Sequence, residues 1–171
     1  SFDALKEQYW DTYGFDNNAE KTALNDACLL EFYRRLDAHM AAGEDILIEY
    51  PFNKRHAPEL KRLIAAHGYR AITLYLYGDM SVIYARGQNR DGDGGRHPGH
   101  LLSCYHKGIT PPPAKADAGT KLTLEQFIES CTRKDYDIRL GYDLRVDVTD
   151  FAAIDYEDIL QRIAENSNIG R

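Results

Sequence analysis

The chain has 171 residues, of which 43% are hydrophobic, and this is enough for one globular domain with a buried core and excludes a disordered protein. Its 21 basic and 27 acidic residues give a formal net charge of -6, which argues against general binding to nucleic acids or anionic membranes. Three widely spaced cysteines, together with no membrane-length apolar run and no signal peptide, predict a cytoplasmic protein with reduced thiols.

The first predicted elements are a long helix and a buried strand. Residues 20–42 place apolar side chains at helical spacing and Gly43 follows, so we expect an amphipathic helix that ends there. The nearly continuous apolar run of residues 45–52 is typical of a parallel strand buried on both faces. Glu49 lies near the carboxyl end of that strand, where we expect function.

A helix, a strand and a further helix are predicted next. Pro58 suits the start of a helix, and Gly68 suits its C-terminal cap. Residues 70–77 predict a second buried strand, after which Asp79 can cap a helix of residues 80–90. This order of elements is typical of an α/β protein.

Beyond residue 90 the sequence predicts loops and short elements. The glycine-rich residues 91–95 predict a flexible loop, and residues 100–107 predict one short helix. Three prolines at 111–113 indicate an excursion over the surface. Thr123 and Gln126 then form the capping box of another helix.

The last predicted elements are a strand at residues 144–148 and a helix at residues 156–164. Strands that alternate with helices predict a mostly parallel sheet with helices on both faces. Three strands are few for such a sheet, which usually has about four to six. We therefore expect that part of the sheet is missing from the sequence.

Four stretches of the sequence together resemble one branch of the P-loop proteins. They are Ser1–Lys6, Ile46–Phe52, Tyr84–His100 and Leu144–Asp150. The most specific is the third, which ends in Arg-His-Pro-Gly-His and resembles an arginine-bearing lid. The set is similar to the zeta-toxin and chloramphenicol-phosphotransferase-like kinases and to related AAA-type ATPases. The resemblance implies a P-loop kinase-like, three-layer α/β/α fold, with residues 1–171 as a single domain and residues 86–122 as its lid and surface excursion.

The phosphate-binding motif of this family, G-x-x-x-x-G-K-[ST], does not occur in the sequence. The family has it between its first strand and first helix, ahead of the position that matches Asp3. That region needs roughly 30 residues or more, so we expect it before Ser1 or in a second chain that completes the sheet. Without the first strand, backbone groups of the strands at residues 46 and 70 lack partners, and we expect the chain to fold poorly alone.

The resemblance gives roles to two carboxylates. Asp3 matches the catalytic residue that accepts the proton of the acceptor hydroxyl, although aspartate also favours this position as a helix cap. Glu49 matches the residue that holds Mg²⁺ through a water beside ATP. The alternative for Glu49 is an ion pair with Lys54 or Arg55.

The resemblance also assigns residues to the nucleotide. Arg90 and Arg96 flank the glycine-rich loop and are catalytic candidates that clamp the triphosphate, since guanidinium groups suit phosphate oxygens. Arg86 is a cofactor-binding candidate, and an exposed, solvated arginine is the alternative. Thr149 lies in the loop that borders the adenine in this family and is the other cofactor-binding candidate.

Zinc is an alternative use of the histidine-rich stretch. His97, His100, Cys104 and His106 carry metal-ligand atoms within ten positions. Their spacings do not match a common zinc finger, so the lid interpretation is preferred.

The sequence therefore favours an ATP- and Mg²⁺-dependent kinase of a small molecule or a nucleotide sugar. A non-catalytic nucleotide-binding remnant, or an ATPase module without the Walker A loop, is the alternative because that loop is absent. A polynucleotide 5′-kinase is a third hypothesis, and the acidic charge argues against it.

Overall fold

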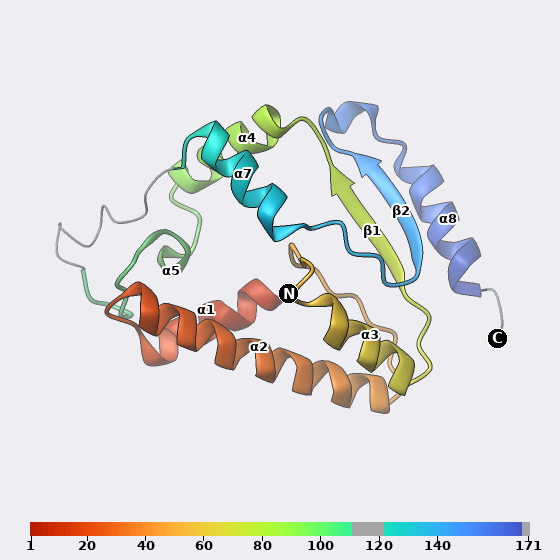
Figure 1. Ribbon diagram of the computed structural model, residues 1–171, viewed down its shortest axis with the longest axis horizontal. Coiled ribbons are helices and arrows are strands. Elements are labelled where there is room, and N and C mark those ends of the chain that lie inside the picture. Colours follow the sequence, from red (N-terminus) through yellow and green to blue (C-terminus); the bar gives the residue numbers. More distant parts are fainter. Residues whose placement is uncertain (111–121, 169–171) are drawn as a thin grey trace. The chain divides into compact units, whose positions relative to one another are not determined.

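The computed structural model describes residues 1–110 and 122–168, which form two compact units. Unit 1 contains residues 1–50 and 88–122, and unit 2 contains residues 51–87 and 123–171. The elements, labelled in Figure 1 where there is room, are α1 (Phe2–Tyr13), α2 (Asn18–Ala41), α3 (Ala57–Ala66), β1 (Ile72–Tyr77), α4 (Met80–Gly92), α5 (Pro98–Leu101), α7 (Leu124–Lys134), β2 (Tyr142–Asp147), the 3-10 turn η1 (Phe151–Ala153) and α8 (Tyr156–Asn168). No helix among the described residues is both long and apolar enough to cross a membrane.

In unit 1, α1 and α2 lie side by side (Figure 1). Phe2 and Leu5 of α1 meet Cys28 and Leu29 of α2 in one buried cluster. The Asn17 side chain accepts the N–H of Glu20 at 3.0 Å and so caps α2. The predicted helix at residues 20–42 is thus confirmed.

A second cluster of unit 1 joins distant parts of the chain. Trp10, Phe15 and Tyr105 are buried together. Phe15 and Tyr105 form an isolated antiparallel bridge in which each N–H donates to the other's carbonyl at 2.8 Å. The prediction of one helix at residues 100–107 is wrong, because helix α5 ends at Leu101 and this bridge takes the backbone groups of Tyr105.

Residues 45–52 do not form the predicted strand. Leu47 is 95% exposed. A strand needs a neighbouring strand for its hydrogen bonds. In the described part of unit 1, β-type pairing occurs only as isolated bridges at other residues, so residues 45–52 have no strand to pair with.

The predicted loop at 91–95 is shorter than expected, because α4 continues to Gly92. The prolines at 111–113 lie outside the described residues.

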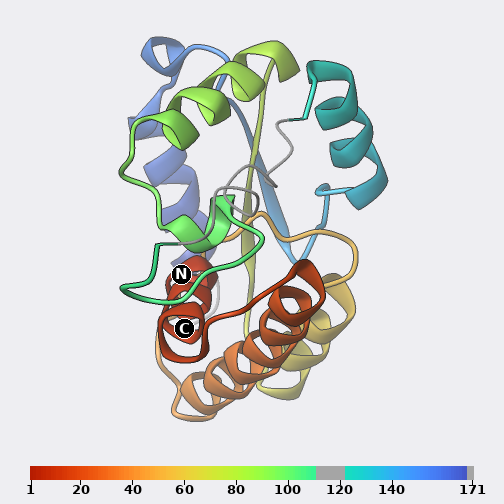
Figure 2. The same cartoon turned by 90° about the vertical axis from the view of Figure 1, so that its left-hand side faces the viewer.

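In unit 2, β1 and β2 pair in parallel with a register from Ile72↔Tyr142 to Tyr77↔Asp147. Two of the three predicted strands are therefore confirmed. Figure 2 shows α7 and α8 on opposite sides of these strands. Within the described residues β1 pairs with β2 alone, and the further strands of a larger sheet stay a prediction.

Several helix ends of unit 2 follow the predicted local rules. Gly68 adopts a φ of +66° after α3 and donates its N–H to the Ala65 carbonyl at 3.3 Å. Thr123 and Gln126 make the reciprocal bonds of a capping box at the start of α7. Both predicted helix boundaries are confirmed, as is the last predicted helix, which appears as α8.

Candidate functional site

The residues that follow the carboxyl ends of β1 and β2 contact one another in unit 2. Gly78 and Asp79 follow β1, and Thr149 follows β2. The N–H of Asp79 donates to Thr149 Oγ1 at 2.8 Å, and a Cβ on Gly78 would lie 3.0 Å from the same oxygen. Open α/β sheets bind ligands at the carboxyl ends of their strands, so this edge is the candidate site of unit 2.

Two carboxylates of this edge are held by hydrogen bonds. Asp79 Oδ1 accepts the Ser81 hydroxyl and the N–H groups of Ser81 and Val82 at the start of α4. These donors lower the pKa of Asp79, the Ser81 hydroxyl most of all. The hydroxyl and N–H of Thr149 likewise lower the pKa of Asp147. Both side chains therefore stay ionised at neutral pH.

Arg86 of α4 joins the same edge. Its Nη1 donates to the carbonyl of Val148, and its Nη2 donates to that of Thr149 at 2.8 Å. Its guanidinium carbon lies 4.0 Å from the ring centroid of Phe151, which is 54% exposed. The structure thus brings together Arg86 and Thr149, the two residues predicted to contact ATP from separate motifs. Phe151 escaped prediction, and its position just after the Thr-Asp turn was the signal available for it.

Replacing Arg86 by alanine is expected to lower the free energy of unfolding by about 2 kcal/mol, because two carbonyls lose a charged donor. Urea denaturation measures the change. Arg90→Ala, in the same helix but 62% exposed, is the control and should stay within about 0.5 kcal/mol of the parent protein. Equal effects of the two substitutions would show that the Arg86 bonds do not stabilise this edge.

In unit 1, Asp3 lies in the first turn of α1 and pairs with Lys6 (Nζ to Oδ1, 2.9 Å). Lys6 is 9% exposed, and its ammonium lies 5.2 Å from the ring centroids of both Trp10 and Tyr50. Aromatic faces attract such a cation. The buried Lys6 ammonium therefore fixes the position of the Asp3 carboxylate. The catalytic role of Asp3 stays a prediction.

Lys21 adds a second cation to the same region, and sequence reasoning missed it. Its ammonium lies 5.6 Å from the Trp10 ring centroid and donates to the Leu102 carbonyl at 3.0 Å. Burial, and after it the positive charges of Lys6 and Arg96, lowers the pKa of Lys21 to about 8. Two ammonium groups, those of Lys6 and Lys21, thus lie near the Trp10 ring centroid, at 5.2 and 5.6 Å.

Arg90 and Arg96, the predicted clamps, share one partner. Both point a guanidinium nitrogen at Asp91 Oδ1, which lies 3.4 Å from Arg90 Nε. Their clamp role stays a prediction. A phosphate must compete with the Asp91 carboxylate for these two groups.

Glu49, the predicted Mg²⁺ ligand and cofactor residue, is exposed and lies in a segment without helix or strand. The expected place at the end of a buried strand is therefore wrong. Its role at a metal is untested and gains no geometric support.

The Arg-His-Pro-Gly-His segment is fixed to α1. His97 Nδ1 accepts the N–H of Gly99 at 3.0 Å, so Nε2 carries the proton and donates to Asp11 Oδ1 at 3.1 Å. A Cβ on Gly99 would lie 2.3 Å from the Trp10 ring. His100 Nε2 is 2.9 Å from Glu7 Oε1. In unit 1 this segment therefore packs on α1 and bonds to it, and its role as a lid stays a prediction.

Asp11 accepts hydrogen bonds from three donors. Its carboxylate accepts from the Tyr105 hydroxyl at 2.6 Å, from Lys107 at 2.7 Å and from His97. These bonds, Lys107 foremost, hold the pKa of Asp11 far below its usual range. Burial, and after it the bond to Asp11, raises the pKa of Tyr105 to about 12. Asp11 therefore fastens residues 97–107 to α1.

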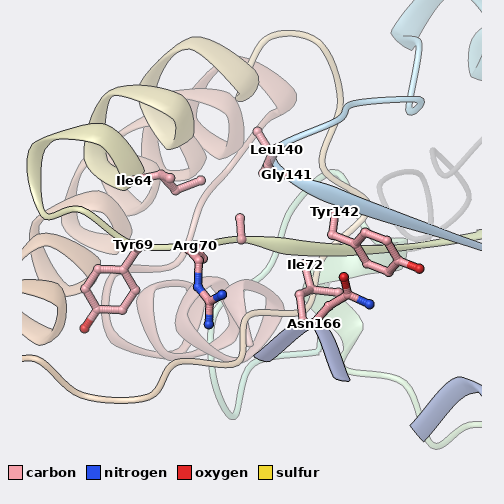
Figure 3. A pocket seen from close by; sticks show the side chains of 9 residues that line it. Ile64, Tyr69, Arg70, Ile72, Leu140, Gly141, Tyr142 and Asn166 are labelled. Carbon is pink, nitrogen blue, oxygen red and sulfur yellow. The ribbon is translucent and has the colours of Figure 1, made fainter. Parts of the chain in front are cut away.

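A cavity of about 330 Å³ in unit 2 lies at the opposite ends of the strands (Figure 3). Its lining comes from α3, the starts of β1 and β2, and Asn166 of α8. Arg70, which also lines it, donates to the Ser167 carbonyl. Because ligands of open α/β sheets bind at the carboxyl ends, we assign this cavity no nucleotide role.

Comparison with known proteins concerns the fold. Neither a scan of protein-family models nor a search of curated proteins returned a match. Among solved structures, the chain is similar to a protein of Chloroflexus aurantiacus J-10-fl described as a "putative kinase", with a TM-score of 0.72 and 20% identity. The match covers 96% of this chain and 81% of that chain. At this identity the likeness shows the fold alone, and the chain has a mixed α/β fold like that of the Chloroflexus protein.

Proposed function

We propose that this chain is part of an ATP-dependent phosphotransferase, a kinase that acts on a small molecule or nucleotide sugar. The observation that carries the proposal is the group of Arg86, Thr149 and Phe151 at the carboxyl edge of a parallel sheet. A nucleotide base stacks on an exposed aromatic ring, and cation–π contacts of arginine add to the binding of bases. The fold shared with the Chloroflexus protein supports the same function.

Unit 1 supplies the groups that an anionic acceptor needs. Phosphoryl transfer depends on positioning and on positive charge around the phosphates, together with a carboxylate that orients the acceptor hydroxyl. Lys6, Lys21 and Arg96 provide positive charge, and Asp3 provides the carboxylate. We assign Asp3 to the acceptor hydroxyl. We assign Arg90 and Arg96 to the phosphates, which they bind once their guanidinium groups have released Asp91.

The residues present do not fit the triphosphate and Mg²⁺ by themselves, because the sequence has no glycine-rich Walker A loop and Glu49 lies in a segment that is neither helix nor strand. The proposal therefore assigns the phosphate cradle to residues upstream of Ser1 or to a second chain. Arg86, Thr149 and Phe151 fit the base instead.

The test compares this chain with the same chain extended by whatever its gene encodes before Ser1. Calorimetry measures ATP binding, and mass spectrometry follows phosphorylation of small-molecule mixtures. We expect transfer by the extended chain, and Asp3→Asn and Arg96→Ala each should lower kcat/KM on the order of a hundredfold. Arg62→Ala, which removes an exposed partner of Glu59 on α3, is the matched control without effect.

Three results contradict the proposal in different ways. Unchanged transfer in both variants, with circular dichroism showing intact folds, removes the residue roles. ATP binding without transfer to any acceptor establishes the non-catalytic alternative. Micromolar binding of ATP by the present chain alone contradicts a phosphate cradle elsewhere.

A further inference from the structure

Three side chains that carry metal-ligand atoms converge in unit 1, and none of them has a role in the proposed phosphoryl transfer. Ligand atoms of Asp16, Cys104 and His106 all lie within 4.8 Å of one another. Asp16 Oδ1 is 3.7 Å from Cys104 Sγ and 3.2 Å from His106 Nε2. One carboxylate oxygen thus lies between a thiol and an imidazole.

The backbone builds this cluster through the bridge between Phe15 and Tyr105. Antiparallel pairing of these two residues makes Asp16 the neighbour of Cys104 across the bridge. Side chains alternate along an extended chain, so Cys104 and His106 share one face while Tyr105 enters the buried cluster with Trp10. The Cys-x-His spacing of the sequence puts two ligands on one face, and one pair of backbone hydrogen bonds places Asp16 beside them.

Gly14 makes room for the imidazole. It adopts a φ of +65°, and a Cβ at this position would lie 2.1 Å from His106 Nδ1. The ring of His106 therefore packs against bare backbone. The N–H of Ile109 donates to the His106 carbonyl at 3.0 Å and closes the turn after it.

The other two histidines of the stretch are engaged elsewhere. The two ring nitrogens of His97 form hydrogen bonds with Gly99 and Asp11. Nε2 of His100 forms a hydrogen bond with Glu7. Of the four residues considered for zinc from the sequence, Cys104 and His106 belong to this cluster. Asp16, distant in sequence, takes the place of His97 and His100.

We propose that Asp16, Cys104 and His106 bind one Zn²⁺ ion, with water as the fourth ligand. Thiolate, imidazole and carboxylate are the ligands zinc takes in proteins, and three protein ligands leave an open position. Mg²⁺ and Ca²⁺ prefer all-oxygen sites and fit this set poorly. Cys104 is buried, whereas the side chains of His106 and Asp16 are 36% and 61% exposed, so the ion is reached from the solvent side. On binding, the thiol proton leaves to solvent and the sulfur bonds to zinc.

The experiment uses the chain without an affinity tag, stripped with a chelator and then titrated with ZnCl₂ or CoCl₂. We expect one Zn²⁺ per chain by elemental analysis and a higher Tm with zinc. Co²⁺ should give a thiolate-to-metal charge-transfer band. Cys104→Ser should abolish this band, and Cys131→Ser, which removes a thiol of unit 2, should leave it unchanged.

Asp16→Ala keeps the test decisive if Cys104→Ser folds poorly, because Asp16 is exposed. We expect it to weaken Zn²⁺ binding at least about tenfold, since even outer partners of a zinc site cost that much. Sub-stoichiometric zinc in the folded parent chain overturns the proposal. A Co²⁺ band that survives Cys104→Ser, or an affinity unchanged in Asp16→Ala, overturns it equally.

Discussion

Replacing Trp10 by alanine is expected to lower the free energy of unfolding by about 3–5 kcal/mol, the range for deleting a large buried aromatic side chain. Trp10 is 1% exposed and packs with Phe15 and Tyr105. Its Nε1 donates to Asn25 Oδ1 at 3.1 Å, so the substitution also leaves a polar partner behind. Its ring centroid lies 4.8 Å from that of His100, so the segment that follows α4 loses contacts as well.

Denaturation followed by circular dichroism measures this change, because Trp10 is the sole tryptophan and its fluorescence disappears with it. Tyr13→Ala is the matched control, since Tyr13 is an aromatic residue of the same helix that is 64% exposed. It should cost no more than about 0.5 kcal/mol. Similar losses in the two variants would mean that the Trp10 cluster does not hold unit 1 together.

Replacing Gly141 by alanine is expected to destabilise unit 2 by about 3 kcal/mol. The added Cβ would lie 2.0 Å from the Ala71 carbonyl oxygen and 2.8 Å from its carbon. These are backbone atoms that cannot rotate away. The same oxygen accepts the N–H of Tyr142 at 2.9 Å, where β1 and β2 begin to pair, so the clash opens the start of the sheet.

Gly87→Ala provides the comparison, because a Cβ there meets no heavy atom within 4 Å and Gly87 lies inside α4. This second change should raise the free energy of unfolding by about 0.5–1 kcal/mol, since alanine favours a helix over glycine. If Gly141 approaches Ala71 as closely as in the structure, urea denaturation should show a lower free energy of unfolding for Gly141→Ala and a higher one for Gly87→Ala. The same sign of change in both variants would contradict that approach.

Much of the secondary structure was predictable because it depends on neighbours in sequence. The helix cap at Asp79 and the capping box of Thr123 and Gln126 involve residues two or three positions apart. Such bonds form wherever the local chain is helical. The same reasoning failed for residues 45–52, because an apolar run becomes a strand only when another strand pairs with it.

Of the candidate site, likewise, some residues were predictable from the sequence and their long-range contacts were not. Arg86 and Thr149 were predicted through a resemblance of separate motifs, but no local pattern indicates that Arg86 bonds to the Val148 and Thr149 carbonyls, 62 and 63 positions away. Lys21 carried no recognisable signal, since a helical lysine is an ordinary residue, and the signal available for Phe151 was its position just after the Thr-Asp turn. The hydrogen bonds of Asp11 were likewise not predictable, because its partners His97, Tyr105 and Lys107 lie 86 to 96 positions along the chain.

The sequence by itself determined the α/β class, most helix ends and two strands, since these follow from hydrophobic period and capping chemistry. Tertiary structure alone decided that Tyr105 pairs with Phe15, and with it that Asp16, Cys104 and His106 meet. The physical reason is that such pairing rests on backbone hydrogen bonds and shared burial between distant segments. Any backbone can offer those bonds, so the choice of partner comes from how the side chains around Trp10 pack.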